Sequence, residues 1–362
     1  METEPFYKKI TPILVGLTFF VYILYMLSDI LIPLAFAGLF AILLNSLHNK
    51  FLRLEIPKVV SIVLTLLIAI LLLASIFYFV MVQLIQFGEM LPELKLKSKA
   101  VLLDLETWVY QTFNIAITKQ TQFLRETISK SKSLIGTTVT GALGVFSVLF
   151  LIPIYIFLLL FYKTLIVNFL FETFSRANSE HVAEVLKETK VAIQSYIKGL
   201  LIETLIVAVL NSGALFLLGV PYAILLGVLG AILNLLPYIG GLVAIFLPVL
   251  MATVTLEGYT TQLLIILAYS VIQFIDNNFL VPMIVSSKVQ INALISILAV
   301  LCGGALWGVS GMFLSIPFIA VLKIIFDRVD DLKHWGKLFG DQVPQRHKGE
   351  IWRFRRKIKV KN

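Results

Sequence analysis

The first half of the chain alternates long apolar segments with polar links. Each apolar segment approaches the length of about 20 residues that a helix needs to cross roughly 30 Å of hydrocarbon. The four segments are 10–27, 30–47, 59–82 and 141–162. Only Ser28 and Asp29 separate the first two, which predicts a helical hairpin. The link 48–58 is short and basic, so we expect it in the cytoplasm, together with the N-terminus.

Two longer stretches are polar. Residues 83–140 carry five acids and seven bases, and their apolar positions recur at helical spacing. Those positions are Val101, Leu102, Leu105, Trp108, Val109 and Phe113. We predict a helical excursion on the extracytoplasmic side. Residues 163–199 place apolar side chains on one face, which predicts a cytoplasmic amphipathic helix that begins near Asn178 or Ser179, both good N-caps.

The second half is apolar and is interrupted by Gly and Pro rather than by charge. Between positions 200 and 322 the only charged residues are Glu203, Glu257, Asp276 and Lys288. The apolar pieces are 200–218, 222–236, 239–255, 261–281, 291–306 and 308–326. Because the segments before and after this half are both expected in the cytoplasm, an even number of its apolar pieces must cross the membrane. The short pieces could form re-entrant hairpins. We predict eight crossings in the whole chain.

The break at 234–241 has a functional implication. Non-helical backbone at membrane depth is tolerated only where protein or a water-filled cavity satisfies its polar groups, so this break should point toward a site or pathway. Residues 230–239 also resemble residues 311–319, each with a Gly at the start and a Pro near the end. Paired segments of this kind are typical of transporters built from repeats. Chance similarity is the alternative, because Gly and Pro are common in membrane helices.

Composition supports the same class of protein. Hydrophobic residues make up 59% of the chain and charged residues 14%, whereas soluble domains have about 25% charged residues. A soluble exterior needs more polar cover than this. We therefore predict an all-α integral membrane protein of about eight transmembrane helices, with Gly/Pro-broken or re-entrant helices in the C-terminal half.

The patterns divide the chain into six parts. They are transmembrane helices 1–3 (1–82), the extracytoplasmic excursion (83–140), a fourth transmembrane helix (141–162), the cytoplasmic amphipathic helix (163–199), a transport module (200–326) and a basic cytoplasmic tail (327–362).

Much of the net charge of +9 lies in the tail. Residues 333–362 contain ten Lys or Arg and two acids. Positive charge next to the last apolar segment holds that end in the cytoplasm and can touch anionic lipid. No fold that would position a nucleic acid accompanies these bases, so we expect the lipid bilayer, and no nucleic acid, as the partner of the tail.

Several chemistries are not expected. The sequence has no phosphate-binding P-loop motif. A single cysteine, Cys302, excludes an internal disulfide and a cysteine-based metal site. The sequence around Ser310 resembles the Gly-x-Ser-Gly motif of rhomboid proteases, but the four histidines fall outside the apolar segments, so the serine has no base within the membrane. We predict no enzyme activity, no metal and no cofactor.

Asp276 is the most informative polar residue. A charged side chain at the centre of a membrane helix costs about 2.5–3.5 kcal/mol, so one that persists has a partner or serves a pathway. Gln273 and Asn277 share a helical face with Asp276 and can donate to its carboxylate. A structural hydrogen-bonding role between helices is the alternative to contact with a substrate or ion.

Glu203 is the second candidate, with Asn211 about two turns further along the same segment. Its alternative role is an ion pair with Lys198 near the cytoplasmic interface. Other candidates for the pathway are polar residues or lie in the break, and the polar ones are equally consistent with bonds between helices. They are Asn234, Pro237, Tyr238, Gly240, Gly241 and Asn292.

Five short blocks occur in an order and spacing that carry a family resemblance. They are Tyr196-Ile-Lys198-Gly199, Gly219-Val-Pro221-Tyr222-Ala223, Pro237-Tyr238-Ile-Gly240, the segment from Gln273 to Pro282 that contains Asp276-Asn277-Asn278, and the segment from Gly303 to Pro317 that contains Trp307-Gly308. Together they resemble the autoinducer-2 exporter family, and the resemblance extends over nearly the whole chain.

The resemblance implies a bacterial inner-membrane transporter of about eight spans, homo-oligomeric, with both termini in the cytoplasm. Its namesake activity is export of the small furanone signal autoinducer-2, and some relatives resemble sodium(lithium)/proton antiporters. The sequence departs from the common pattern at Gly241, where a Pro is frequent, at Asp276, where Glu is usual, and at Asn292-Ala293, which lacks the usual Pro. The substrate need not be autoinducer-2.

Three functional hypotheses follow. The leading one is a transporter, and more specifically an exporter, of a small polar solute such as autoinducer-2 or a related metabolite. The first alternative is a sodium(lithium)/proton antiporter that uses Asp276 or Glu203. The second is a non-transporting membrane scaffold whose excursion 83–140 binds partners.

Overall fold

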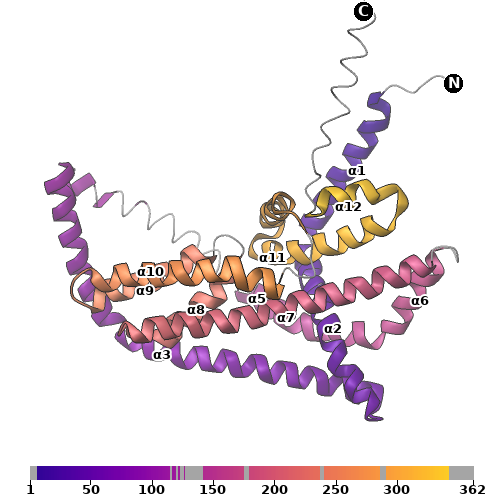
Figure 1. Ribbon diagram of the computed structural model, residues 1–362, viewed down its shortest axis with the longest axis horizontal. Helices are drawn as coiled ribbons and strands as arrows, with labels where there is room; N and C mark the ends of the chain where they lie inside the picture. Colours follow the sequence, from indigo (N-terminus) through magenta and orange to yellow (C-terminus); the bar gives the residue numbers. More distant parts are fainter. Residues whose placement is uncertain are drawn as a thin grey trace, which may run out of the picture.

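A computed structural model describes residues 6–114, 116–119, 121–122, 126, 142–174, 179–236, 240–285 and 291–341 (Figure 1). All regular elements in this part of the chain are helical, which confirms the all-α prediction. The elements are α1 (Phe6–Met26), α2 (Ser28–Arg53), α3 (Lys58–Phe113), α5 (Ala142–Phe161), α6 (Lys163–Thr173), α7 (Ser179–Leu217), α8 (Ala223–Asn234), α9 (Gly240–Thr255), α10 (Thr260–Ile275), the π-helical η2 (Asp276–Val285), α11 (Ala293–Arg328), the short 3₁₀ turn η4 (Asp330–Leu332) and α12 (Lys333–Phe339).

Many of these helices are long and apolar enough to cross a membrane. Within the described residues, five qualify by length and composition: Ser28–Arg53, Lys58–Glu89, Glu180–Leu217, Thr260–Ile284 and Ala293–Arg328. The last of these is not one straight helix, because it folds back at Trp307 and Gly308. A sixth is added if α5 and α6, bent by 62° at their junction, are one span. Shorter apolar helices occur at Thr11–Met26, Ala223–Asn234 and Val243–Thr255. The chain is a multi-pass membrane protein, while the count of eight crossings stays a prediction.

The N-terminal helices pack through α2, α3 and α5. Their shared core contains Ala37, Ala41, Ile62, Leu66, Ile156 and Leu160. Helix α3 continues from its membrane part into the predicted excursion without a break, so the predicted boundary at residue 82 lies inside one helix. Most of the excursion after Asn114 lies outside the described residues.

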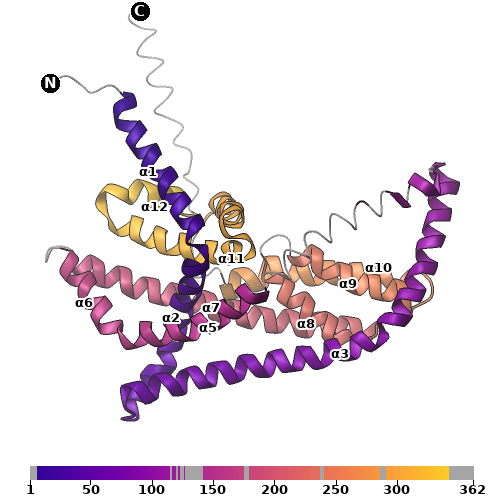
Figure 2. The same cartoon turned by 180° about the vertical axis from the view of Figure 1, so that it is seen from behind.

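Helix α7 is the central element of the second half (Figures 1 and 2). It begins at Ser179 and continues to Leu217, so the predicted amphipathic helix and the following span form one helix. A second core cluster joins α2, α7 and α11 through Leu39, Ile193, Tyr196, Ile197 and Leu314. This cluster attaches the N-terminal helices to the second half of the chain.

Helices α7 to α10 form an antiparallel set. A Cβ atom on Gly227 of α8 would lie 2.4 Å from the backbone nitrogen of Ser212, so glycine allows α8 to fold back closely on α7. A Cβ atom on Gly230 would lie 3.5 Å from the Cβ of Ala244, which places α8 beside α9. Helix α10 then returns beside α9 and α7. The break between α8 and α9, which the sequence predicted, therefore lies at the end of a helical hairpin.

Helix α11 is also a hairpin. Trp307 and Gly308 have non-helical backbone angles, with φ of +59° at Gly308. The two arms touch, because a Cβ atom on Gly311 would lie 1.9 Å from the carbonyl oxygen of Gly303. Ser315 Oγ donates to the carbonyl of Ala299 at 2.8 Å. This is the shape of a re-entrant segment and agrees with the predicted Gly/Pro-broken helices.

Candidate functional site

Two carboxylates from distant parts of the chain meet at one amide. Asn234, at the end of α8, donates from Nδ2 to Asp276 Oδ2 at 2.9 Å and to Glu203 Oε1 at 3.3 Å. Glu203 comes from α7, and Asp276 lies where α10 becomes the π-helical η2. The end of α8 thus carries the residue that bridges Glu203 and Asp276, the only two acids between positions 200 and 322 outside the turn 256–259.

The carboxylate site, which we define as Glu203, Asn234 and Asp276, is shielded from solvent. Glu203 is 5% exposed and Asp276 is 2% exposed. Asp276 Oδ1 has no hydrogen-bond partner within the protein. Among the described residues, neither acid forms an ion pair, so the predicted alternative of a pair between Glu203 and Lys198 is not present. The site can therefore offer acceptor atoms to a ligand.

Gln273 supports the site from α10. Its Nε2 lies 3.5 Å from Asp276 Oδ2 and 3.4 Å from Asn277 Oδ1. Gly241 makes room for it, because a Cβ atom there would lie 2.3 Å from Gln273 Oε1. Asn277 itself is exposed. Gln273 is thus the second amide at Asp276, and it packs directly on the start of α9.

The other glycine of the break has a backbone role. A Cβ atom on Gly240 would lie 2.1 Å from the carbonyl oxygen of Leu233. Any side chain at Gly240 would force α9 away from the end of α8, where Asn234 lies. Pro237 and Tyr238, the remaining candidates in the break, lie outside the described residues.

Asn292 lies apart from the carboxylate site. Its Oδ1 accepts from the backbone nitrogen of Ile295 and caps α11, as an N-cap residue does. Its Nδ2 donates to the carbonyls of Leu338 at 2.6 Å and Gly340 at 3.1 Å, at the end of α12. Asn292 therefore fastens α12 to the base of the α11 hairpin, and the structure does not bring it to Asp276.

One buried polar residue near the site was missed by the sequence reasoning. Tyr269 of α10 is 4% exposed, and its hydroxyl has no hydrogen-bond partner in the protein. A tyrosine in an apolar segment gives a weak signal, because such residues are frequent in membrane helices. Its spacing of seven residues from Asp276, two helical turns, was the available clue.

The side chains of the carboxylate site are two carboxylates and one amide. Within the described part of the chain, no group of three His, Cys, Asp or Glu residues is close enough to hold a metal ion. Carboxylates and amides supply acceptors and donors for hydroxyl groups. The arrangement can bind and orient a small ligand but contains no nucleophile–base pair at the site.

Comparison with known proteins identifies the family. Residues 14–331 match the family model described as "AI-2E family transporter". The chain belongs to this family. The match covers all three residues of the carboxylate site and extends over both halves of the molecule.

Curated relatives of this AI-2E family transporter are named for transport. YueF of Bacillus subtilis is 25% identical over 317 residues, which cover 83% of this chain and 84% of YueF. A transport protein of Haemophilus influenzae is 25% identical over 325 residues, 87% of this chain and 91% of that protein. YrrI of Bacillus subtilis is 31% identical over 140 residues, and this match spans only 39% of either chain. Family and relatives together show a membrane transporter.

Proposed function

We propose that this AI-2E family transporter exports a small, hydroxyl-rich polar solute, such as autoinducer-2 or a related metabolite, from the bacterial cytoplasm. The observation that carries the proposal is the bridge from Asn234 to Glu203 and Asp276. Buried acids in a membrane protein are expensive and usually serve transport. Carboxylates are strong acceptors for hydroxyl donors, and the free Oδ1 of Asp276 is available for one.

The proposal includes the setting of the protein in the cell. We place the protein in the bacterial cytoplasmic membrane, as a homo-oligomer with both termini in the cytoplasm. The relatives occur in bacteria and are named for transport. Family membership favours transport over a non-transporting scaffold.

Export can be tested by comparing the metabolites outside cells that produce the wild-type protein, Asp276→Asn or no transporter. We expect one or more polar metabolites to accumulate outside wild-type cells and to fall to the level of cells without the protein in Asp276→Asn. Glu257→Gln is the matched control, because Glu257 is an acid of the same half that lies exposed in the turn between α9 and α10. Equal export by wild type and Asp276→Asn would remove Asp276 from the mechanism.

A cation/proton exchange is the second candidate. The observation that favours it is that two carboxylates share one neutral amide and, among the described residues, form no ion pair with Lys or Arg. Such a pair can exchange protons for sodium or lithium. In proteoliposomes with a pH gradient and a fluorescent pH dye, added sodium or lithium chloride should dissipate the gradient. The absence of a response at any pH from about 6 to about 9 would exclude this candidate.

A further inference from the structure

A second group of residues lies beside the carboxylate site on the same three helices. Asn211 on α7, Gly230 on α8 and Tyr269 on α10 form what we call the neutral layer. Each lies about one to two helical turns along the chain from a residue of the carboxylate site: Asn211 from Glu203, Gly230 from Asn234 and Tyr269 from Asp276. One to two turns correspond to a displacement of roughly 6–12 Å. Because α8 and α10 run opposite to α7, the three displacements point the same way, toward the turn 218–222 that joins α7 to α8.

The two side chains of the neutral layer converge on the glycine. A Cβ atom on Gly230 would lie 3.3 Å from Asn211 Nδ2 and 3.7 Å from the Tyr269 hydroxyl. Asn211 is 3% exposed and Tyr269 is 4% exposed. Neither Asn211 Oδ1 nor the Tyr269 hydroxyl has a hydrogen-bond partner in the protein. Buried polar atoms nearly always have a partner, so these two groups point to a ligand or water between the helices.

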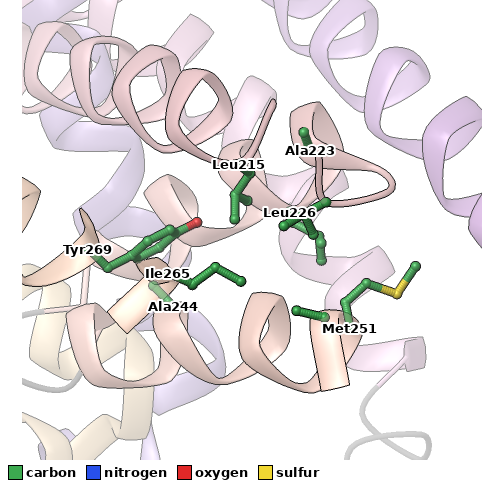
Figure 3. Packing of buried hydrophobic residues seen from close by; sticks show 9 residues of the cluster. Leu215, Ala223, Leu226, Ala244, Met251, Ile265 and Tyr269 are labelled. Carbon is green, nitrogen blue, oxygen red and sulfur yellow. The ribbon is translucent and has the colours of Figure 1, made fainter. Parts of the chain in front are cut away.

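One further turn toward 218–222, each of the three helices contributes one buried apolar side chain. These are Leu215 of α7, Leu226 of α8 and Ile265 of α10, each four residues from a member of the neutral layer. Leu215 and Ile265 are fully buried and Leu226 is 4% exposed. Figure 3 shows the three side chains gathered between their helices, with the Tyr269 hydroxyl directed toward Leu215. We call these three side chains the apolar layer.

We propose that the neutral layer is the second half of the solute site. Glu203 and Asp276 would hold the hydroxyl groups at one end of the solute, and Asn211 and Tyr269 the uncharged oxygens at the other. An amide and a phenol both donate and accept, so this end suits a hydroxyl, carbonyl or ring-ether group. The apolar layer separates the solute from the side of the turn 218–222. The inference rests on the proposed function, but the thiol-labelling test of it does not depend on export.

Thiol labelling of the full-length protein in membrane vesicles tests the layers without a known solute. In a Cys302→Ser background, the variants Asn211→Cys and Tyr269→Cys are compared with Leu215→Cys and Ile265→Cys. The reagent is the small cation 2-(trimethylammonium)ethyl methanethiosulfonate. A hydrated site predicts that the first pair reacts roughly tenfold faster than the second, since thiol reactivity follows exposure to water. Unchanged gel-filtration profiles in detergent verify folding.

The outcomes separate the two proposals. Equally slow labelling of all four variants would overturn the neutral layer as a solute site, even if Asp276→Asn abolishes export. Equally fast labelling would overturn the apolar layer as its closed end. If labelling follows the expected pattern but Asp276→Asn exports normally, the neutral layer is supported as a solute site and the role of the carboxylates in transport is rejected. Tyr269→Phe, which keeps the ring, should change the set of exported metabolites; an unchanged set would overturn contact between Tyr269 and the solute.

Discussion

Asn234 links two acids that come from different helices. Its Nδ2 contacts both Glu203 and Asp276. A carboxylate needs donors when it leaves water, and a side-chain amide supplies them without adding charge. The carboxylate oxygens therefore stay available as acceptors for a ligand. A neighbouring Lys or Arg would occupy these oxygens and prevent ligand binding.

Asn234→Ala should destabilise the protein. Removing the amide leaves Glu203 Oε1 without this donor and leaves Asp276 Oδ2 with the longer contact from Gln273, at a cost of about 1–3 kcal/mol for an unsatisfied group. Thermal unfolding in detergent should occur at a lower temperature, and export should fall. Asn278→Ala is the control, because Asn278 is exposed and donates only to the carbonyl of Phe274 on its own helix. The same unfolding temperature for wild type and Asn234→Ala would contradict the bridging role.

Gly241→Ala should impair transport because it displaces the side chain of Gln273. The added methyl group would lie 2.3 Å from Gln273 Oε1 and must displace that side chain from Asp276. We expect export to fall roughly tenfold, which corresponds to about 1.4 kcal/mol. Gly213→Ala is the control, since nothing lies within 4 Å of its new methyl group. Equal losses in both variants would indicate a general effect of glycine replacement.

At the scale of the element, the α11 hairpin depends on close approach of its two arms. Gly303 and Gly311 allow backbone contact, and Trp307 Nε1 donates to the carbonyl of Leu24 at 3.0 Å, which ties the hairpin tip to α1. At the base, Arg328 pairs with Glu184 at 2.8 Å and with Glu188, both on α7. The hairpin is therefore fixed to different helices at its two ends.

Gly311→Ala should separate the arms of this hairpin. The new methyl group would meet the carbonyl oxygen of Gly303, which belongs to the backbone and cannot rotate away. Overpacking of this kind costs about 1–3 kcal/mol. Gly304→Ala meets only the flexible end of Met312 and should cost less. Thermal unfolding of both variants in detergent measures the difference, and a larger loss for Gly304→Ala would contradict the hairpin packing.

Much of the element pattern was predictable because apolar length and Gly/Pro breaks act locally. The start of α7 at Ser179 and the break after Asn234 follow from such signals. The meeting of Glu203 with Asp276 does not, because it depends on how far α8 and α10 fold back on α7. Asn292 illustrates the same limit, since only the position of α12 reveals that its amide caps one helix and fastens another.

At the scale of the whole molecule, charge and apolar length together predict an orientation. The tail beyond position 332 carries ten bases, and positive charge of this density stays in the cytoplasm. Fusion of green fluorescent protein after Asn362, which keeps all ten bases, should give fluorescent cells, and fusion of alkaline phosphatase there should be inactive. Fusion of alkaline phosphatase after Phe113, the end of α3, should be active. The opposite pattern would reverse the proposed topology and place the apolar layer on the cytoplasmic side.

Helix α3 is longer than every other helix in the described part of the chain. It contains 56 residues, of which Lys58–Glu89 form the apolar part. The remaining 24 residues, 90–113, can extend up to about 36 Å beyond that part at the rise of an α-helix. Pro92 removes a backbone donor near the start of this extension and favours a bend, and Figure 1 shows α3 turning near its far end. The distal end of α3 can therefore lie as far from the apolar part of the helix as the hydrocarbon layer of a bilayer is thick, roughly 30 Å.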